Sequence, residues 1–161
     1  MLSPPLDVLV DWQVDRSRWI DQMICEASLA PPPVVPLPLG TTDVPEMLEL
    51  TAATEPGPFL PQTIQMGSYF GIRANDGRLV AMAGERLRST AFAEISAVCT
   101  HPEFRGRGYA RDLTTFLAAQ ILAAGRTPFL HVKSENGAKV VYQKIGFHLR
   151  TAIYLTVISL H

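Results

Sequence analysis

The feature that most constrains the fold is the stretch from residue 94 to residue 111, which reads EISAVCTHPEFRGRGYAR. Its first part is an apolar run typical of a buried strand, its middle is a short basic loop with two glycines, and its last part begins a helix. A strand that passes through a glycine-rich loop into a helix directs several backbone N–H groups at one point, where the helix dipole adds positive potential. The stretch therefore predicts a site for a phosphate or pyrophosphate group.

Composition excludes several classes of protein. A chain of 161 residues with 47% hydrophobic and 18% charged residues is typical of one globular domain. The net charge of −1 argues against a nucleic-acid binder, which would carry a basic excess. The sequence contains no apolar run of about 18 residues, so we expect no membrane span. The first residues lack the basic and apolar segments of a signal peptide, so we expect a cytoplasmic protein.

The cysteines and histidines favour neither a disulfide framework nor a metal site. Cys25 and Cys99 both lie outside any C-x-x-C motif, and the four histidines are scattered. We therefore expect no bound metal, and we interpret Cys99 as a small hydrophobic residue in a strand.

The order of predicted elements indicates a mixed α/β fold. Residues 1–33, which end in three prolines, are interpreted as an N-terminal extension and linker, and residues 34–161 as the domain. In the domain, an antiparallel meander precedes a parallel β-α-β crossover. The expected strands are 34–39 at an edge, 68–74, 78–88, 91–101, 127–132 and one or two within 147–160; the expected helices are 43–54, 108–124 and one after residue 137.

Two carboxylates fall in apolar strands. Strict alternation places Glu94 on one face with Val98, and Cys99 on the opposite face. A carboxylate in such a run is unfavourable unless it is paired or hydrated, which makes Glu94 a candidate for acid–base work, with a salt bridge to an arginine as the alternative. Glu85 is the second candidate, and a frayed strand end that reaches solvent is its alternative.

Three phosphate-binding motifs compete for the glycine loop. The P-loop motif G-x-x-x-x-G-K-[ST] is absent from the sequence. The dinucleotide motif G-x-G-x-x-G/A fits Gly106 and Gly108 but fails at Arg111. The pattern R/Q-x-x-G-x-G/A is filled by residues 105–110.

With this last pattern, the chain resembles the GNAT acyltransferase superfamily, whose pyrophosphate loop for coenzyme A has the same form. The passage from Val98 to Phe104 is similar to the family's strand-to-loop passage V-x-P-E-[YF]-R. Downstream, residues 136–138, Tyr142 and residues 146–147 resemble its N-x-x-A-x-x-x-Y-x-x-x-G-F pattern. The resemblance covers residues 34–158. Residues 56–59 and 83–86 are most similar to the glycine N-acyltransferase-like branch.

The resemblance implies acetyl-CoA as the acyl donor and an amine as the acceptor. The reaction it implies needs a base, for which we expect Glu94 or a water that it holds, with Glu85 second. Tyr142 is the expected acid that protonates the leaving thiolate, with a core aromatic as its alternative. Asn136 lies one residue nearer Ala138 than in the usual pattern. The residues implied in binding the donor are Val98, Cys99, Thr100, Arg105, Gly106, Arg107, Gly108, Tyr109, Ala110 and Asn136.

Other classes of function stay open on the sequence. The same fold could bind acyl-CoA as a non-catalytic sensor or scaffold, and Arg105 and Arg107 could be solvated loop charges. The acceptor could be a small-molecule amine or an amine of a peptide or protein. A free sheet edge would allow a homodimer.

Overall fold

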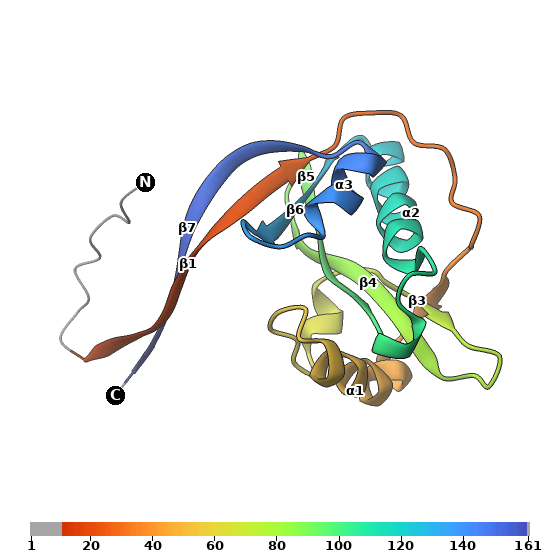
Figure 1. The fold of residues 1–161 in the computed structure, drawn as a ribbon, viewed down its shortest axis with the longest axis horizontal. Helices are drawn as coiled ribbons and strands as arrows, with labels where there is room; N and C mark the ends of the chain where they lie inside the picture. The colour runs from red at the N-terminus through yellow and green to blue at the C-terminus, as the bar shows by residue number, and fades with distance from the viewer. Residues whose placement is uncertain (1–10, 161) are drawn as a thin grey trace.

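The computed structural model describes residues 11–160, and Figure 1 shows a twisted sheet with helices on both faces. Within these residues, seven strands form one sheet in the order β2-β3-β4-β5-β6-β1-β7. β2 to β5 pair antiparallel in sequence order, and β5 then pairs parallel with β6. This confirms the mixed α/β fold expected from the sequence. The strands are β1 Trp12–Ile24, β2 Leu37–Leu39, β3 Tyr69–Arg73, β4 Leu79–Arg88, β5 Phe92–Thr100, β6 Thr127–Lys133 and β7 His148–Leu160.

Helices cover both faces of the sheet, because the strands carry apolar side chains on both faces. α2 (Tyr109–Ala123) and α3 (Lys139–Ile145) lie on one face, and α1 (Val44–Thr54) lies on the other (Figure 1). On the first face, Leu113 and Leu117 of α2 are fully buried in one core with Ile95 of β5. On the second face, Met47 of α1 packs in a separate core with Met82 of β4. Short 3₁₀ turns at Thr41–Asp43, Thr63–Met66 and Pro102–Phe104 complete the elements.

Residues 11–33 differ from the extension that we expected, and residues 1–10 lie outside the described part of the chain. Residues Trp12–Ile24 form β1, which lies inside the sheet between β6 and β7. The side chain of Met23 is buried in the core with α2, which explains why this segment joins the sheet. The proline-rich segment then crosses the top of the molecule from β1 to β2 at the far edge (Figure 1). It connects two parts of one sheet.

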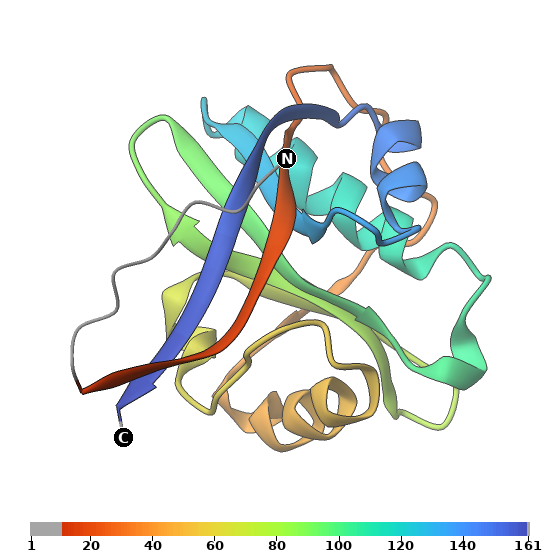
Figure 2. The ribbon, with the colours of Figure 1, turned by 60° about the vertical axis from the view of Figure 1, so that its left-hand side comes forward.

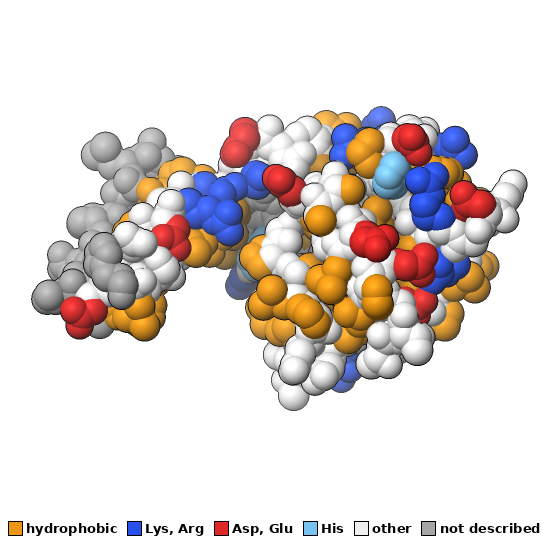
Figure 3. All heavy atoms as spheres, turned by 90° about the horizontal axis from the view of Figure 1, so that it is seen from below, with side chains coloured by type: hydrophobic (Ala, Val, Ile, Leu, Met, Phe, Trp, Pro, Cys, Tyr) orange, Lys and Arg blue, Asp and Glu red, His pale blue; other side chains and the backbone are white. Residues whose placement is uncertain are grey.

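The outer halves of β1 and β7 form a two-stranded ribbon. β7 pairs with β1 from Trp12 to Ile24, whereas β6 pairs with β1 at residues 20–24. The ribbon therefore extends away from the body, as Figures 1 and 2 show from two sides. Figure 3, seen from below, shows the ribbon clear of a body on which hydrophobic side chains gather. Within residues 11–160, none of the helices is long and apolar enough to cross a membrane.

A bulge interrupts β5 at Ala97. Its φ angle is 52°, and the pairing with β4 shifts by one residue between Cys99 opposite Met82 and Ser96 opposite Gly84. An extra residue of this kind reverses the alternation beyond it. Cys99 consequently packs in the α1 core and Val98 packs towards α2, whereas strict alternation placed Val98 with Glu94. The bulge is the first feature that builds the candidate site.

Candidate active site

Strands β5 and β6 begin as a parallel pair and then separate. Their pairing covers Phe92–Glu94 of β5 with residues 127–129 of β6 and ends there. Beyond this point β5 continues through the bulge at Ala97 towards the glycine-rich loop. The bulge and the separation together free the β6 side of residues 97–100 for a ligand.

The glycine-rich loop has the conformation that its sequence predicts. Gly106 and Gly108 have φ angles of 77° and 85°, a region of backbone conformation that is unfavourable for residues other than glycine. Gly108 is the N-cap of α2, so the loop ends at the positive end of a helix of 15 residues. The backbone N–H groups of this first turn can bind an anion.

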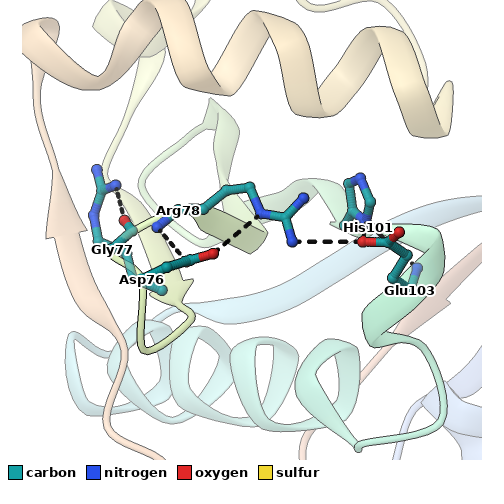
Figure 4. Close-up of polar contacts among 6 residues, drawn as sticks. Asp76, Gly77, Arg78, His101 and Glu103 are labelled. Carbon is teal, nitrogen blue, oxygen red and sulfur yellow. Dashed lines mark hydrogen bonds and ion pairs between the residues drawn. The ribbon is translucent and has the colours of Figure 1, made fainter.

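Ion pairs fix the segment that precedes the glycines (Figure 4). Arg78, next to the β3–β4 turn, places its Nη2 atom 3.5 Å from Oε2 of Glu103. Its Nε atom is 4.0 Å from Oδ2 of Asp76, and the guanidinium carbon lies 5.2 Å from the ring centre of Phe104. The backbone N–H of Glu103 donates to Nδ1 of His101 at 3.4 Å. These contacts attach the start of the loop to the meander.

A cleft of about 550 Å³ lies where β5, the loop, α2 and α3 meet. It brings together every predicted donor-binding residue except Arg107, whose guanidinium instead lies 4.7 Å from the ring centre of Phe104. Arg111 lines the cleft and was missed from the sequence, although its place in the first turn of α2 was a usable signal. The predicted residues in the walls are Val98, Cys99, Thr100, Arg105, Gly106, Gly108, Tyr109, Ala110, Asn136 and Tyr142.

The polar groups that line the cleft differ in whether they can hydrogen-bond to a ligand. Oγ1 of Thr100 is buried and has no hydrogen-bond partner among the described residues. Oδ1 of Asn136 accepts from the backbone N–H of Ala138 at 2.9 Å, so this amide shapes the entry to α3. Burial raises the pKa of Tyr142 to about 12, so its hydroxyl keeps its proton at neutral pH. Burial also raises the pKa of Cys99 to about 11, which keeps this thiol neutral.

Glu94 lies on the opposite face of the sheet, fully buried and doubly paired. Its carboxylate accepts from Nη2 and Nε of Arg86 at 2.7 and 3.0 Å. Oε1 also lies 2.8 Å from Nδ1 of His131. Burial acts to raise the pKa of Glu94, but the hydrogen bonds from His131 and Arg86 outweigh it and lower this pKa below its ordinary value. The salt bridge that we considered as the alternative for Glu94 is therefore present.

The contacts of Glu94 continue across the sheet. Nε2 of His131 lies 3.0 Å from Nε2 of Gln22, and Oε1 of Gln22 accepts from Nη1 of Arg150 at 2.6 Å. Five neighbouring strands, β4, β5, β6, β1 and β7, each contribute one side chain to this series, which we call the polar row: Arg86, Glu94, His131, Gln22 and Arg150. Only Glu94 was expected from the sequence, because the other four residues become its neighbours through strand pairing alone.

Glu85 lies outside both groups. Its side chain is buried and contacts the guanidinium of Arg88, and its backbone N–H donates to the carbonyl of Ser68 at 3.0 Å. It is not among the residues that line the cleft, so the structure does not bring it together with Tyr142. Among residues 11–160, no group of three or more His, Cys, Asp and Glu side chains could hold a metal ion.

Comparisons with known proteins agree with this geometry. Residues 69–156, more than half of the chain, match the family described as FR47-like protein. A chain from Novosphingobium aromaticivorans, assigned to the GNAT family of acetyltransferases, is 38% identical with a TM-score of 0.90. That similarity covers 98% of this chain and 71% of the other. The glycine N-acyltransferase-like branch finds no support among these matches.

More distant structures share the fold. A GNAT-family acetyltransferase from Colwellia psychrerythraea is 21% identical with a TM-score of 0.70, and the chain spans 56% of its length. The ribosomal-protein-S18-alanine N-acetyltransferase of Escherichia coli is 21% identical with a TM-score of 0.64; the similarity covers 77% of this chain and 92% of that enzyme. No curated protein sequence matches the chain.

Proposed function

Because the chain belongs to the GNAT family of acetyltransferases, we propose that it transfers an acetyl group from acetyl-CoA to an amine. The observation that carries the proposal is the cleft, in which a bulged strand, a glycine-rich helix N-terminus and a buried tyrosine meet. Each of these features matches one part of an acyl-CoA thioester in chemistry: the carbonyl, the pyrophosphate and the leaving sulfur.

The loop and the strand would bind the donor. Backbone N–H groups after Gly106 and Gly108 would hold the pyrophosphate, with the guanidinium of Arg105 beside them. A single helix dipole contributes only about 0.3–1 kcal/mol, so converging N–H groups and arginines are needed as well. Backbone N–H groups near Val98 to Thr100 would stabilise the oxyanion that forms on the thioester carbonyl. The unpartnered hydroxyl of Thr100 supports a ligand at this place.

Tyr142 and Glu94 are the proposed acid–base residues. Tyr142 lines the cleft and keeps its proton at neutral pH, so it is placed to give that proton to the leaving thiolate. An amine acceptor such as a lysine has a pKa of about 10.4 and must lose a proton before it attacks. Glu94, in the last pair of the β5–β6 ladder, belongs to the machinery that removes this proton. Glu85, whose carboxylate is paired with Arg88, has weaker support.

The acceptor is an amine of a small molecule or of a protein. The Escherichia coli relative acts on the alanine of a ribosomal protein, which supports a protein amine as one candidate. The cytoplasmic location and a homodimeric state belong to this proposal and rest on the sequence alone.

The test is release of the CoA thiol in the presence of a panel of amines. We expect acetyl-CoA and free CoA to raise the melting temperature, and at least one amine of the panel to give thiol release above background hydrolysis. Stabilisation by CoA without thiol release on any amine would favour the non-catalytic acyl-CoA sensor. Stabilisation by ATP or NAD in place of CoA would contradict the donor itself.

A further inference from the structure

The polar row fixes the position of a proton on His131. The guanidinium of Arg150 can only donate, so the oxygen of the Gln22 amide faces it at 2.6 Å. The amide nitrogen of Gln22 then faces Nε2 of His131, which must accept. The proton of the imidazole consequently lies on Nδ1 and is donated to Glu94 at 2.8 Å. His131 is thus arranged with a free electron pair on Nε2 and a carboxylate behind it.

His131 also lies next to the place where the strands separate. The last pair of the β5–β6 ladder joins Glu94 to Phe129, and His131 is two residues further along β6 on the same face. Its side chain is 20% exposed, whereas that of Glu94 is 1% exposed. Gln22, which covers Nε2, is also part of the wall of a second cavity of about 320 Å³ that Phe92 and Phe129 line. An amine in this cavity has one amide between itself and Nε2.

We propose that Nε2 of His131 accepts the proton of the acceptor amine, which enters from the second cavity and takes the place of the Gln22 amide. His131 is then the catalytic base, and Glu94 is a positioning residue that holds the proton of Nδ1 and stabilises the imidazolium. The inference rests on the proposed acetyl transfer and assigns the proton step of that reaction.

Proton transfer to His131 and acetyl transfer to the amine conserve atoms and charge. An N–H bond of the ammonium breaks, its proton moves to Nε2, and the electron pair stays on the amine nitrogen. This pair forms the new C–N bond with the thioester carbonyl, the C–S bond breaks, and its electron pair leaves on the sulfur. The nitrogen loses a second proton on forming the amide, and the sulfur gains one. The imidazolium returns its proton to solvent.

The surroundings of the imidazole favour this assignment over direct proton transfer to Glu94. Glu94 of β5 touches the ring, Arg86 of β4 neutralises Glu94, and Arg150 of β7 acts through Gln22 of β1. Tyr69 of β3 is neutral at these pH values, because burial raises its pKa to about 12. Glu94 already accepts three hydrogen bonds from Arg86 and His131 and is 1% exposed, so it offers the amine no direct contact.

The kinetic test compares His131→Asn with wild type, using acetyl-CoA and an amine that the wild type accepts. We expect kcat/KM to fall by about 100-fold or more at neutral pH, as for removal of a general base. In the pH profile of kcat/KM, the rise that an imidazole base gives between about pH 5 and 8 should disappear. The rise that comes from deprotonation of the amine substrate should stay. The thermal shift produced by CoA should be unchanged. His148→Asn, an exposed histidine of β7 outside the row, is the control.

Glu94→Gln separates the two residues. We expect it to lower kcat/KM but to keep the ascending limb that His131→Asn removes, because the base itself is still present. The inference is overturned if His131→Asn keeps the rate and the limb of the wild type. A direct base at Glu94 would instead give a limb below about 4.5, since its pKa is lowered. Absence of thiol release by the wild type overturns the proposed function and this inference together.

A measurement that needs no turnover tests the assignment even if one of the variants fails to fold. Histidine-selective nitrogen NMR of the free wild-type protein should show His131 with its proton on Nδ1 in the neutral state. Gln22→Ala should leave this proton in place, because Glu94 still accepts it. A proton on Nε2 in the neutral wild-type protein would contradict the assignment.

Discussion

The two faces of strand β5 carry two kinds of site. On the α2 face, the cleft is built mainly from residues 98–111, which follow one another in the sequence. On the α1 face, the polar row takes one side chain from each of five strands. The first depends on backbone N–H groups and glycine conformations, whereas the second depends on strand register. A local site can be recognised from a short stretch of sequence, and a site distributed over a sheet cannot.

The two faces should also differ in their effect on stability. In the polar row, the carboxylate of Glu94 is charged and buried, and the contacts with Arg86 and His131 stabilise its charge. In the cleft, the polar groups are neutral or, like Arg105, Arg111 and Lys144, belong to exposed side chains. Removing one partner of a buried ion pair leaves an unpaired charge, which is far more costly than the loss of a surface contact. Four predictions test this difference.

The largest effect is expected for Arg86→Met, which leaves Glu94 without its bidentate partner. We expect the free energy of unfolding to fall by about 3–5 kcal/mol, the usual cost of breaking a buried pair. Urea denaturation measures it. Arg78→Met is the matched control, because Arg78 pairs with Asp76 and Glu103 at the surface. Such pairs contribute about 0–1 kcal/mol. Similar losses in the two variants would contradict the contrast between the faces.

Stability at acid pH tests the same carboxylate. The folded-state pKa of Glu94 is lowered, so its unfolded form binds a proton at higher pH than its folded form. Its contribution is therefore present above about pH 4.5 and is lost as the pH falls through the folded-state value. Glu94→Gln should show a weaker pH dependence of the urea midpoint below pH 4.5 than wild type. Parallel curves for the two proteins would show that Glu94 is not the group involved.

These differences explain what the sequence could predict. The order of elements from β2 to β7 follows from apolar periodicity and turn residues, and the loop follows from Gly106 and Gly108. The bulge at Ala97 has no signal in the sequence, because alanine rarely adopts positive φ. β1 was interpreted as an extension because the strands between which it lies are more than a hundred residues downstream. Without β1, Gln22 cannot be placed beside His131, and the row cannot be predicted.

The glycine loop should show a smaller effect, confined to ligand binding. Gly108→Ala places a Cβ atom 3.1 Å from Nη2 of Arg111, so this side chain must give way, and the φ angle of 85° strains the new residue. We expect the dissociation constant for CoA, measured by calorimetry, to rise about tenfold. The free energy of unfolding should fall by about 1–2 kcal/mol, because alanine is strained in the left-handed conformation. Gly77→Ala, with a φ angle of 88° in the β3–β4 turn and open space around its Cβ atom, is the control. It should lose similar stability and keep CoA affinity; equal affinity loss in both would place the anion site elsewhere.

Tyr142→Phe should have the smallest effect, because it removes one hydroxyl from a cleft that keeps its shape. The ring stays packed against Phe147, at a centroid distance of 6.3 Å. A thiol with a pKa of about 8.5 is already a fair leaving group, so protonation of the thiolate contributes modestly, and we expect kcat to fall about fivefold. Thiol-release kinetics and CoA calorimetry should diverge, with turnover slowed and affinity retained. If binding and turnover fall together, Tyr142 supports the wall of the cleft and the acid lies elsewhere, which would make the α2 face a binding surface and leave the acid–base chemistry to the polar row.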